Sequence, residues 1–268
     1  MRYAVWFVRL LFAAWMIPAG LNHFISLFPQ PMGTQALSHE LIVALLDSHL
    51  FDLVKAVELL AGVCVLFGFY APLALVICMA VSFCVFYWDA PLEGWGSRAA
   101  LFGWAALLST VLLCLSYYKN YLPMLTLRAQ AQKQQLALAG RIVFGAWMAL
   151  NGANYFFISL WSATPVGHEP LAIQLMTALV DSNLLDVAMV MQLVAGVLIL
   201  AGIVVPAALC VLMPISSCAL FWAVILDHSL QNMVLALAAF ALNGLLMLAY
   251  LPYYRGTLQR RTLAFGEA

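Results

Sequence analysis

Charged residues are scarce in this chain of 268 residues. Only 8% of the residues are Asp, Glu, Lys or Arg, whereas 66% are hydrophobic, and the mean hydropathy is +1.02. A water-soluble domain carries about a quarter charged residues, so the composition excludes a soluble fold. Alternating ten-residue segments of the kind that a membrane β-barrel needs are also lacking. Apolar runs of about 20 residues recur instead, and each can cross a ~30 Å hydrocarbon core as a helix.

Several signatures of chemistry are missing too. No CxxC pair occurs, and all six cysteines fall inside apolar runs, which argues against disulfides or a thiolate metal site and for soft, buried filler. No phosphate-binding loop, nucleophile elbow or zinc motif is found. A single histidine, His23, is clearly embedded in a membrane helix, so a bis-histidine haem is not expected. No basic, aromatic surface suggests nucleic acid.

One segment is present twice. Residues 47–62, DSHLFDLVKAVELLAG, return at 181–196 as DSNLLDVAMVMQLVAG. The preceding helix also returns, at an offset of 132 residues, and the following helix at 134; the matching positions are Arg9 and Arg141, Gly20 and Gly152, Asn22 and Asn154, Pro72 and Pro206, Ser82 and Ser216, Trp88 and Trp222. The sequence therefore predicts an all-α integral membrane protein with eight transmembrane helices, built as a tandem duplication of a four-helix bundle.

The predicted boundaries follow from the apolar runs and from Pro and Gly. Transmembrane helices are expected at about 4–27, 48–68, 72–88 and 98–118, with a short interfacial helix at 38–46 and an outer loop at 89–94. Residue Asp47 or Ser48 could cap the second helix. The first four-helix unit is 1–118, a linker covers 119–135, and the second unit is 136–268.

Basic residues set the orientation. Nine of the eleven Lys and Arg residues lie at the two ends or around the linker: Arg2, Arg9, Lys119, Arg128, Lys133, Arg141, Arg255, Arg260 and Arg261. By the positive-inside rule, both termini and the linker are expected on the cytoplasmic side of a bacterial inner membrane. Because each unit has an even number of crossings, the two halves should run in the same direction.

The candidate site lies in the first copy of the repeated segment. Asp52, Lys55 and Glu58 are spaced i, i+3, i+6, so they share one helix face, and Glu58 is expected near the bilayer midplane. An ionisable group there is costly unless paired, and usually faces the bundle interior. Two interpretations stay open: a structural Lys55–Glu58 pair that fixes packing, or a ligand or proton site.

The preceding helix adds His23, which should lie at the same depth as Asp52. A cluster of His23, Asp52, Lys55 and Glu58 is the predicted site, although a structural role for the histidine stays open. In the second copy the corresponding residues are Tyr155, Met189 and Gln192, so the titratable groups are lost. Arg9 is expected to extend toward cytoplasmic phosphates.

These residues resemble a known family. An early arginine, Gly20 followed by Asn22-His23-Phe24, and Glu58 with Gly62 resemble a DoxX/DoxD-type four-helix membrane domain, present here as two tandem copies over nearly the whole chain. The resemblance implies roles in quinone-linked sulfur oxidation, membrane oxidoreductase complexes, or assembly. Arg9, His23 and Glu58 match the family's polar positions, whereas Tyr155 and Gln192 depart from them, so one site in the first half is implied.

The expected function is an accessory or quinone-interacting subunit of a membrane redox complex. Its quinone-binding residues would be His23, Asp52, Lys55, Glu58, Asn22 and Arg9, with no metal and no assigned catalytic residue. Its partners would be the lipid bilayer and other membrane subunits. The alternative is a non-catalytic structural or assembly subunit. A small-solute carrier is disfavoured, because matching interrupted helices are not found in the two halves.

Overall fold

The computed structural model describes all residues except 1, 133, 159, 161–166, 263 and 265–268, so Lys133, used above for orientation, lies outside the described residues. The chain forms two compact units. Unit 1 comprises Met1–Tyr121 together with Arg255–Ala268, and unit 2 comprises Leu122–Tyr254. The described part of both units is helical apart from turns, loops and one isolated β-bridge between Phe69 and Arg261.

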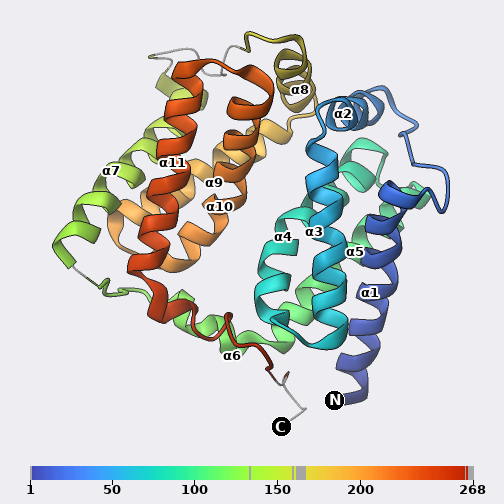
Figure 1. Ribbon diagram of the computed structural model, residues 1–268, viewed down its shortest axis with the longest axis horizontal. Helices are drawn as coiled ribbons and strands as arrows, with labels where there is room; N and C mark the ends of the chain where they lie inside the picture. The colour runs from blue at the N-terminus through green and yellow to red at the C-terminus, as the bar shows by residue number, and fades with distance from the viewer. Residues whose placement is uncertain (1, 133, 159, 161–166, 263, 265–268) are drawn as a thin grey trace. The chain divides into compact units, whose positions relative to one another are not determined.

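Unit 1 is a bundle of four long helices in which each helix contacts the next in a closed ring (Figure 1). In chain order these are α1 (Arg2–Ile25), α3 (Leu50–Phe67), α4 (Ala71–Tyr87) and α5 (Arg98–Ser116). The short α2 (Ala36–Asp47) lies at the end of the bundle where α3 begins. A π-helix, Trp88–Leu92, continues α4, and α6 (Tyr118–Tyr121) closes the unit's first segment.

Unit 2 has the same order of elements. After a 3-10 turn (Leu122–Leu125), its ring of helices is α7 (Gln134–Ala153), α9 (Leu184–Ala201), α10 (Val205–Phe221) and α11 (Leu230–Ala249), with the short α8 (Pro170–Asp181) between α7 and α9. Two π-helices, Asn154–Ile158 and Trp222–Asp227, continue α7 and α10, and a 3-10 turn (Leu251–Tyr254) follows α11.

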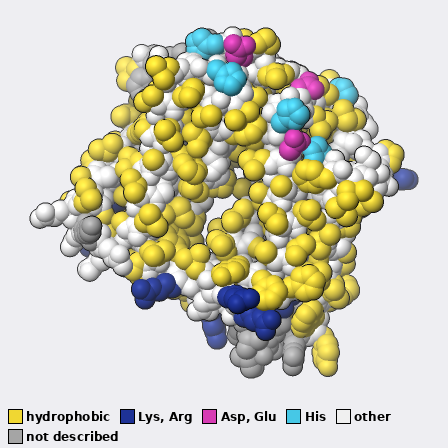
Figure 2. Space-filling view, in the orientation of Figure 1, with side chains coloured by type: hydrophobic (Ala, Val, Ile, Leu, Met, Phe, Trp, Pro, Cys, Tyr) yellow, Lys and Arg dark blue, Asp and Glu magenta, His cyan; other side chains and the backbone are white. Residues whose placement is uncertain are grey.

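The helices fit a bilayer by length and composition. Among the described residues, seven helical segments are long and apolar enough to cross a membrane: Tyr3–Ile25, Ala71–Leu92, Arg98–Ser116, Gln134–Ile158, Leu184–Ala201, Val205–Asp227 and Leu230–Ala249. Helix α3 has 18 residues but carries the three charges of Asp52, Lys55 and Glu58. Figure 2 shows apolar side chains along the flanks of the helices, with acidic and histidine side chains near α2 and near α8.

The core of unit 1 is apolar and tightly packed. Its fully buried side chains come from all four long helices and include Phe12, Met16, Val65, Leu75 and Leu113. Glycine lets α1 and α3 approach closely, because a Cβ on Gly20 would lie 2.8 Å from the Lys55 carbonyl oxygen and one on Gly62 would lie 2.8 Å from Cγ1 of Ile17. This contact fixes which residues of α1 and α3 face each other.

Two local expectations were wrong. The outer loop predicted at 89–94 is in large part the π-helix Trp88–Leu92, so Asp89 and Glu93 are buried rather than solvated. A π-turn accommodates Pro91 without ending the helix, which is why the Pro signal misled. Helix α3 begins after His49, whose φ of 58° is left-handed, and no side chain caps it; Ser48 Oγ lies 3.5 Å from the Leu50 nitrogen.

Candidate functional site

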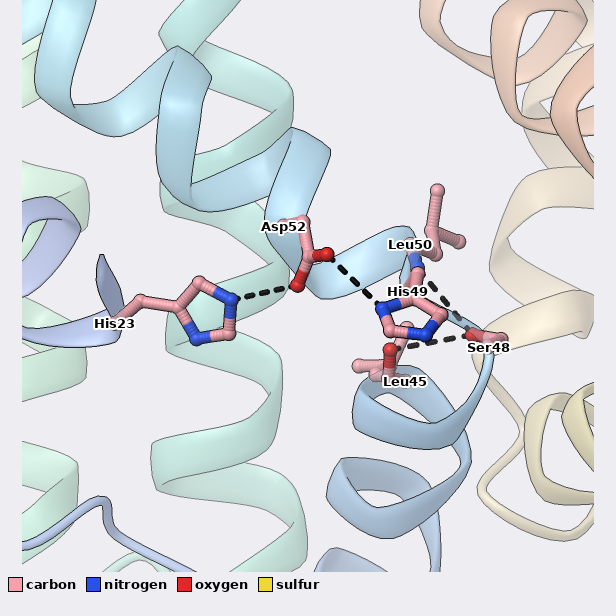
Figure 3. Close-up of polar contacts among 6 residues, drawn as sticks. All are labelled: His23, Leu45, Ser48, His49, Leu50 and Asp52. Atoms are coloured by element: carbon pink, nitrogen blue, oxygen red, sulfur yellow. Dashed lines mark hydrogen bonds and ion pairs between the residues drawn. The ribbon is translucent and has the colours of Figure 1, made fainter.

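The outer part of the candidate site is a carboxylate held between two histidines (Figure 3). Asp52 Oδ1 lies 2.6 Å from Nε2 of His23, and Asp52 Oδ2 lies 3.0 Å from Nδ1 of His49. The side chain of His23 is 15% exposed, that of Asp52 44% and that of His49 76%. The three rings and carboxylate thus lead from the surface into the bundle.

The packing of α1 on α3 explains why His23 meets Asp52. The helices are antiparallel and touch where Gly20 faces the backbone between Lys55 and Leu59. One turn further along α1 is His23, and one turn back along α3 is Asp52, so the two side chains meet at the same level. The His23 ring also packs edge-on against Phe51, with the ring centroids 5.3 Å apart. The sequence prediction that these two residues share a depth agrees with this geometry.

The inner part of the site is an ion pair buried on the same helix. Lys55 Nζ lies 2.7 Å from Oε2 of Glu58, and the ammonium group also lies 4.8 Å from the ring centroid of Phe51. Glu58 is only 1% exposed and Lys55 9%. His23 and Lys55 are both within electrostatic reach of Glu58, so the outer and inner parts form one continuous cluster.

A third buried acid was missed by sequence reasoning. Asp89 is 6% exposed, and it lies within electrostatic reach of Lys55. Gly103 on α5 makes room for it, since a Cβ there would lie 2.6 Å from Cβ of Asp89. The repeat carried a usable signal: the residue 134 positions after Asp89 is Ala223, a further loss of charge in the second half.

The cluster is short of positive charge. Two buried carboxyl groups, Glu58 and Asp89, face one ammonium group, Lys55. An ion pair can stabilise one carboxylate, but a second buried carboxylate without a cation costs several kcal/mol, so such a group takes up a proton instead. The inner cluster, defined as Lys55, Glu58 and Asp89, can therefore hold and exchange one proton.

Two residues predicted for the site lie elsewhere. Arg9 is 14 residues before His23, about 21 Å along the helix axis, and it is buried rather than extended to phosphates: its Nη2 donates to the Tyr117 hydroxyl, and its guanidinium lies 5.3 Å from the Trp6 ring centroid. Asn22 is next to His23 in sequence, but its Oδ1 accepts a hydrogen bond of 2.6 Å from the Phe28 nitrogen.

The Asn22 contact is repeated in unit 2, where Oδ1 of Asn154 accepts from the Leu160 nitrogen, also at 2.6 Å. An asparagine that holds the chain after the first helix in both units serves the fold. We therefore leave Asn22 and Arg9 out of the site proposed below.

Unit 2 keeps the packing and loses the charge. The Tyr155 hydroxyl donates to Asp186, as His23 contacts Asp52 in unit 1. Met189 and Gln192 are buried at the places of Lys55 and Glu58, and Gln192 Oε1 has no hydrogen-bond partner among the described residues. A Cβ on Gly152 would lie 2.8 Å from the Met189 carbonyl oxygen, so the helices approach as closely as in unit 1.

Outside the membrane segments, Glu93 fixes the start of α2. It accepts hydrogen bonds from the Thr34 nitrogen at 2.7 Å, from the Thr34 hydroxyl at 2.5 Å, and from the Ser38 hydroxyl. Burial alone would raise the pKa of the Glu93 carboxyl, but these hydrogen bonds outweigh it and lower that pKa below its usual value. Glu93 thus acts as an ionised anchor for α2 rather than as a proton carrier.

Comparison of the chain with models of known families, with curated proteins and with solved structures found no match. Among the described residues, no group of three or more His, Cys, Asp or Glu side chains could hold a metal ion. The functional argument therefore depends on the geometry of unit 1 and on its contrast with unit 2.

Proposed function

We propose that unit 1 contains an intramembrane proton-exchanging site that serves a quinone head group, and that the chain is an accessory or quinone-interacting subunit of a membrane redox complex. The observation that carries the proposal is the charge imbalance of the inner cluster, in which two buried carboxyl groups share one ammonium group. The redox role itself comes from the resemblance to the DoxX/DoxD family.

The route for the proton is supported by the exposure of the outer residues. His49 and Asp52 are open to the surface, His23 is mostly enclosed, and Glu58 is fully buried. Histidine changes its protonation state near neutral pH, so His23 can pass a proton between Asp52 and the inner cluster. A path of this kind has no use in a purely structural ion pair, which is best sealed from water.

The chemistry of the inner cluster suits a quinone. Each quinone carbonyl accepts a hydrogen bond, and the Lys55 ammonium has three N–H donors, of which Glu58 takes one. A protonated Asp89 carboxyl would be a second donor. A quinone supplies two-electron redox chemistry with proton uptake; the residues of this chain would hold its carbonyl groups and deliver the protons.

The proposal includes a membrane arrangement. Helix α3 is proposed as an eighth membrane crossing, in which the inner cluster neutralises its own charges, and the two units are proposed to be tandem copies of one four-helix bundle in a bacterial inner membrane. Both termini and residues 119–135 would then be cytoplasmic. A reporter fused after Gln135 should read cytoplasmic, and one inserted at Gly33 external; the opposite result at either place would overturn the topology.

The proton site can be tested by infrared spectroscopy. The purified protein at neutral pH should show the C=O stretch of a protonated carboxyl group, and this band should vanish in Asp89→Asn and persist in Asp52→Asn. A wild-type spectrum without a protonated carboxyl group would disprove the charge argument.

The quinone can be tested on the same preparation by mass spectrometry. Protein purified in native lipid should carry bound quinone, and the triple variant Lys55→Met, Glu58→Gln, Asp89→Ala, which copies unit 2, should lose it while remaining folded. A triple variant that keeps both its quinone and its redox activity would favour the alternative function, a structural or assembly subunit without a substrate.

A further inference from the structure

Each unit binds a segment that follows the last helix of the opposite half of the sequence. We call residues 122–132, which follow α6, the first arm, and residues 255–262, which follow the turn after α11, the second arm. The first arm contacts the turn between α9 and α10 in unit 2. The second arm contacts the turn between α3 and α4 in unit 1.

In unit 1 the second arm is held by several contacts. The Tyr70 nitrogen donates to the Arg260 carbonyl oxygen at 3.0 Å, and Phe69 forms an antiparallel bridge with Arg261. The guanidinium groups of Arg260 and Arg261 lie 5.8 and 5.1 Å from the ring centroid of Phe69, within cation–π range. Asn120 Nδ2 donates to the Gly256 carbonyl oxygen at 2.8 Å.

In unit 2 the first arm makes the corresponding contacts. The Val204 nitrogen donates to the Leu127 carbonyl oxygen at 3.1 Å, and the Gln132 nitrogen donates to the Ala249 carbonyl oxygen at 2.9 Å. The Gln130 nitrogen donates to the Tyr253 hydroxyl at 2.8 Å.

The two sets of contacts are reciprocal. Val204 follows Tyr70 by 134 residues and Arg260 follows Leu127 by 133, so the same backbone bond forms twice, each time with an arm from the other half. Both donors have left-handed backbones, with φ of 47° at Tyr70 and 42° at Val204. A β-branched residue rarely adopts that conformation, which indicates that the turn is shaped to receive an arm.

We infer that the turn after the second long helix of each half is a docking site for the arm of another four-helix unit of the same kind, and that the two halves hold each other by exchanging arms. The occupant of the unit 1 site is the second arm, and the occupant of the unit 2 site is the first arm. The inference rests on the duplication proposed above and is independent of the proton site.

Disulfide cross-linking in the intact chain tests the exchange. A bridged residue pair has Cα atoms about 4.5–5.5 Å apart, which suits a disulfide. The pair Phe69→Cys with Arg261→Cys should therefore cross-link, as should Ile203→Cys with Arg128→Cys, the pair at the equivalent positions. The matched controls, Phe69→Cys with Arg128→Cys and Ile203→Cys with Arg261→Cys, join each turn to the arm of its own half and should not cross-link.

Separated halves provide the second measurement. Chains 1–132 and 133–268, co-expressed with different tags, should co-purify, and Phe69→Cys in one with Arg261→Cys in the other should give a covalent heterodimer. Halves that end at Tyr121 and Tyr254 lack both arms and should co-purify much less. Cross-links in the control pairs of the intact chain, or equal co-purification without arms, would overturn the exchange, whereas neither result would change the infrared or quinone measurements.

Discussion

Removal of the Lys55 charge is the perturbation with the largest expected effect on stability. Lys55→Met leaves Glu58 and Asp89 buried without a cation. Breaking a buried ion pair by removing one partner typically costs about 3–5 kcal/mol, and at roughly 2–4 °C per kcal/mol for a chain of this size the melting temperature should fall by on the order of ten degrees.

The companion variants make the expectation specific. Glu58→Gln leaves Lys55 with a second carboxylate within reach, so it should cost clearly less than Lys55→Met. The double variant Lys55→Met, Glu58→Gln should return to within about 1 kcal/mol of wild type, because Met189 and Gln192 already pack at these places in unit 2 and Asp89 can stay protonated. Met189→Lys, which places a new charge in unit 2, is the matched control and should destabilise.

The assay is thermal unfolding in a mild detergent at neutral pH, followed by tryptophan fluorescence, with gel filtration to confirm that each variant is monodisperse. The ranking is decisive. If Glu58→Gln proves as costly as Lys55→Met, Asp89 does not share the ammonium group. If the double variant is less stable than either single variant, the charges of the cluster do not compensate each other as described.

Three further predictions concern packing and pH. Gly20→Ala should separate α1 from α3, because its Cβ would meet backbone atoms at 2.8 Å, whereas Gly244→Ala, with no atom within 4 Å, should be neutral or gain about 0.5–1 kcal/mol; equal melting temperatures would contradict the close approach. Asn243 is fully buried and neither polar side-chain atom has a partner among the described residues, so Asn243→Thr, which recreates beside Ser216 the hydroxyl pair of unit 1, should raise stability by about 1–3 kcal/mol, and a lower melting temperature would show that the amide is satisfied. Because the pKa of Glu93 is lowered in the folded state, its stabilising effect is present above the unfolded value of 4.5 and is lost as pH falls below it; hydrogen exchange at the start of α2 should accelerate in acid, and in Glu93→Gln it should be independent of pH.

The pairing of α1 with α3 was the part of the site most accessible from sequence. Gly20 and Gly62 mark where the two helices can touch, and the antiparallel direction then brings His23 to Asp52. Glu58 was assigned to the interior because a lone carboxylate at that depth is too costly to face lipid. These inferences needed only spacing along a single helix and the direction of its neighbour.

Contacts across long sequence separations could not be predicted in the same way. Arg9 meets Tyr117, 108 residues away, and spacing within one helix says nothing about that pairing. Asp89 was hidden by its neighbours, because Pro91 and Gly94 are typical of a solvent-exposed turn, while the structure continues the helix in a π-turn. Comparison of the halves position by position, rather than motif by motif, would have pointed to Asp89 through its replacement by Ala223.

The second arm also imposes an order of events on biosynthesis. Unit 1 is translated first, yet the carbonyl group that Tyr70 requires belongs to Arg260, which emerges almost at the end of the chain. At about 5–20 residues per second, the turn waits on the order of ten seconds or more after Tyr121 has been made. During that interval the first arm is the nearer candidate, so a contact between Tyr70 and Leu127 would have to be released before Val204 could claim the same carbonyl group. Unit 1 is thus the first part of the protein to be synthesised and the last to be completed, and a chain that stops at Tyr254 would leave it unfinished.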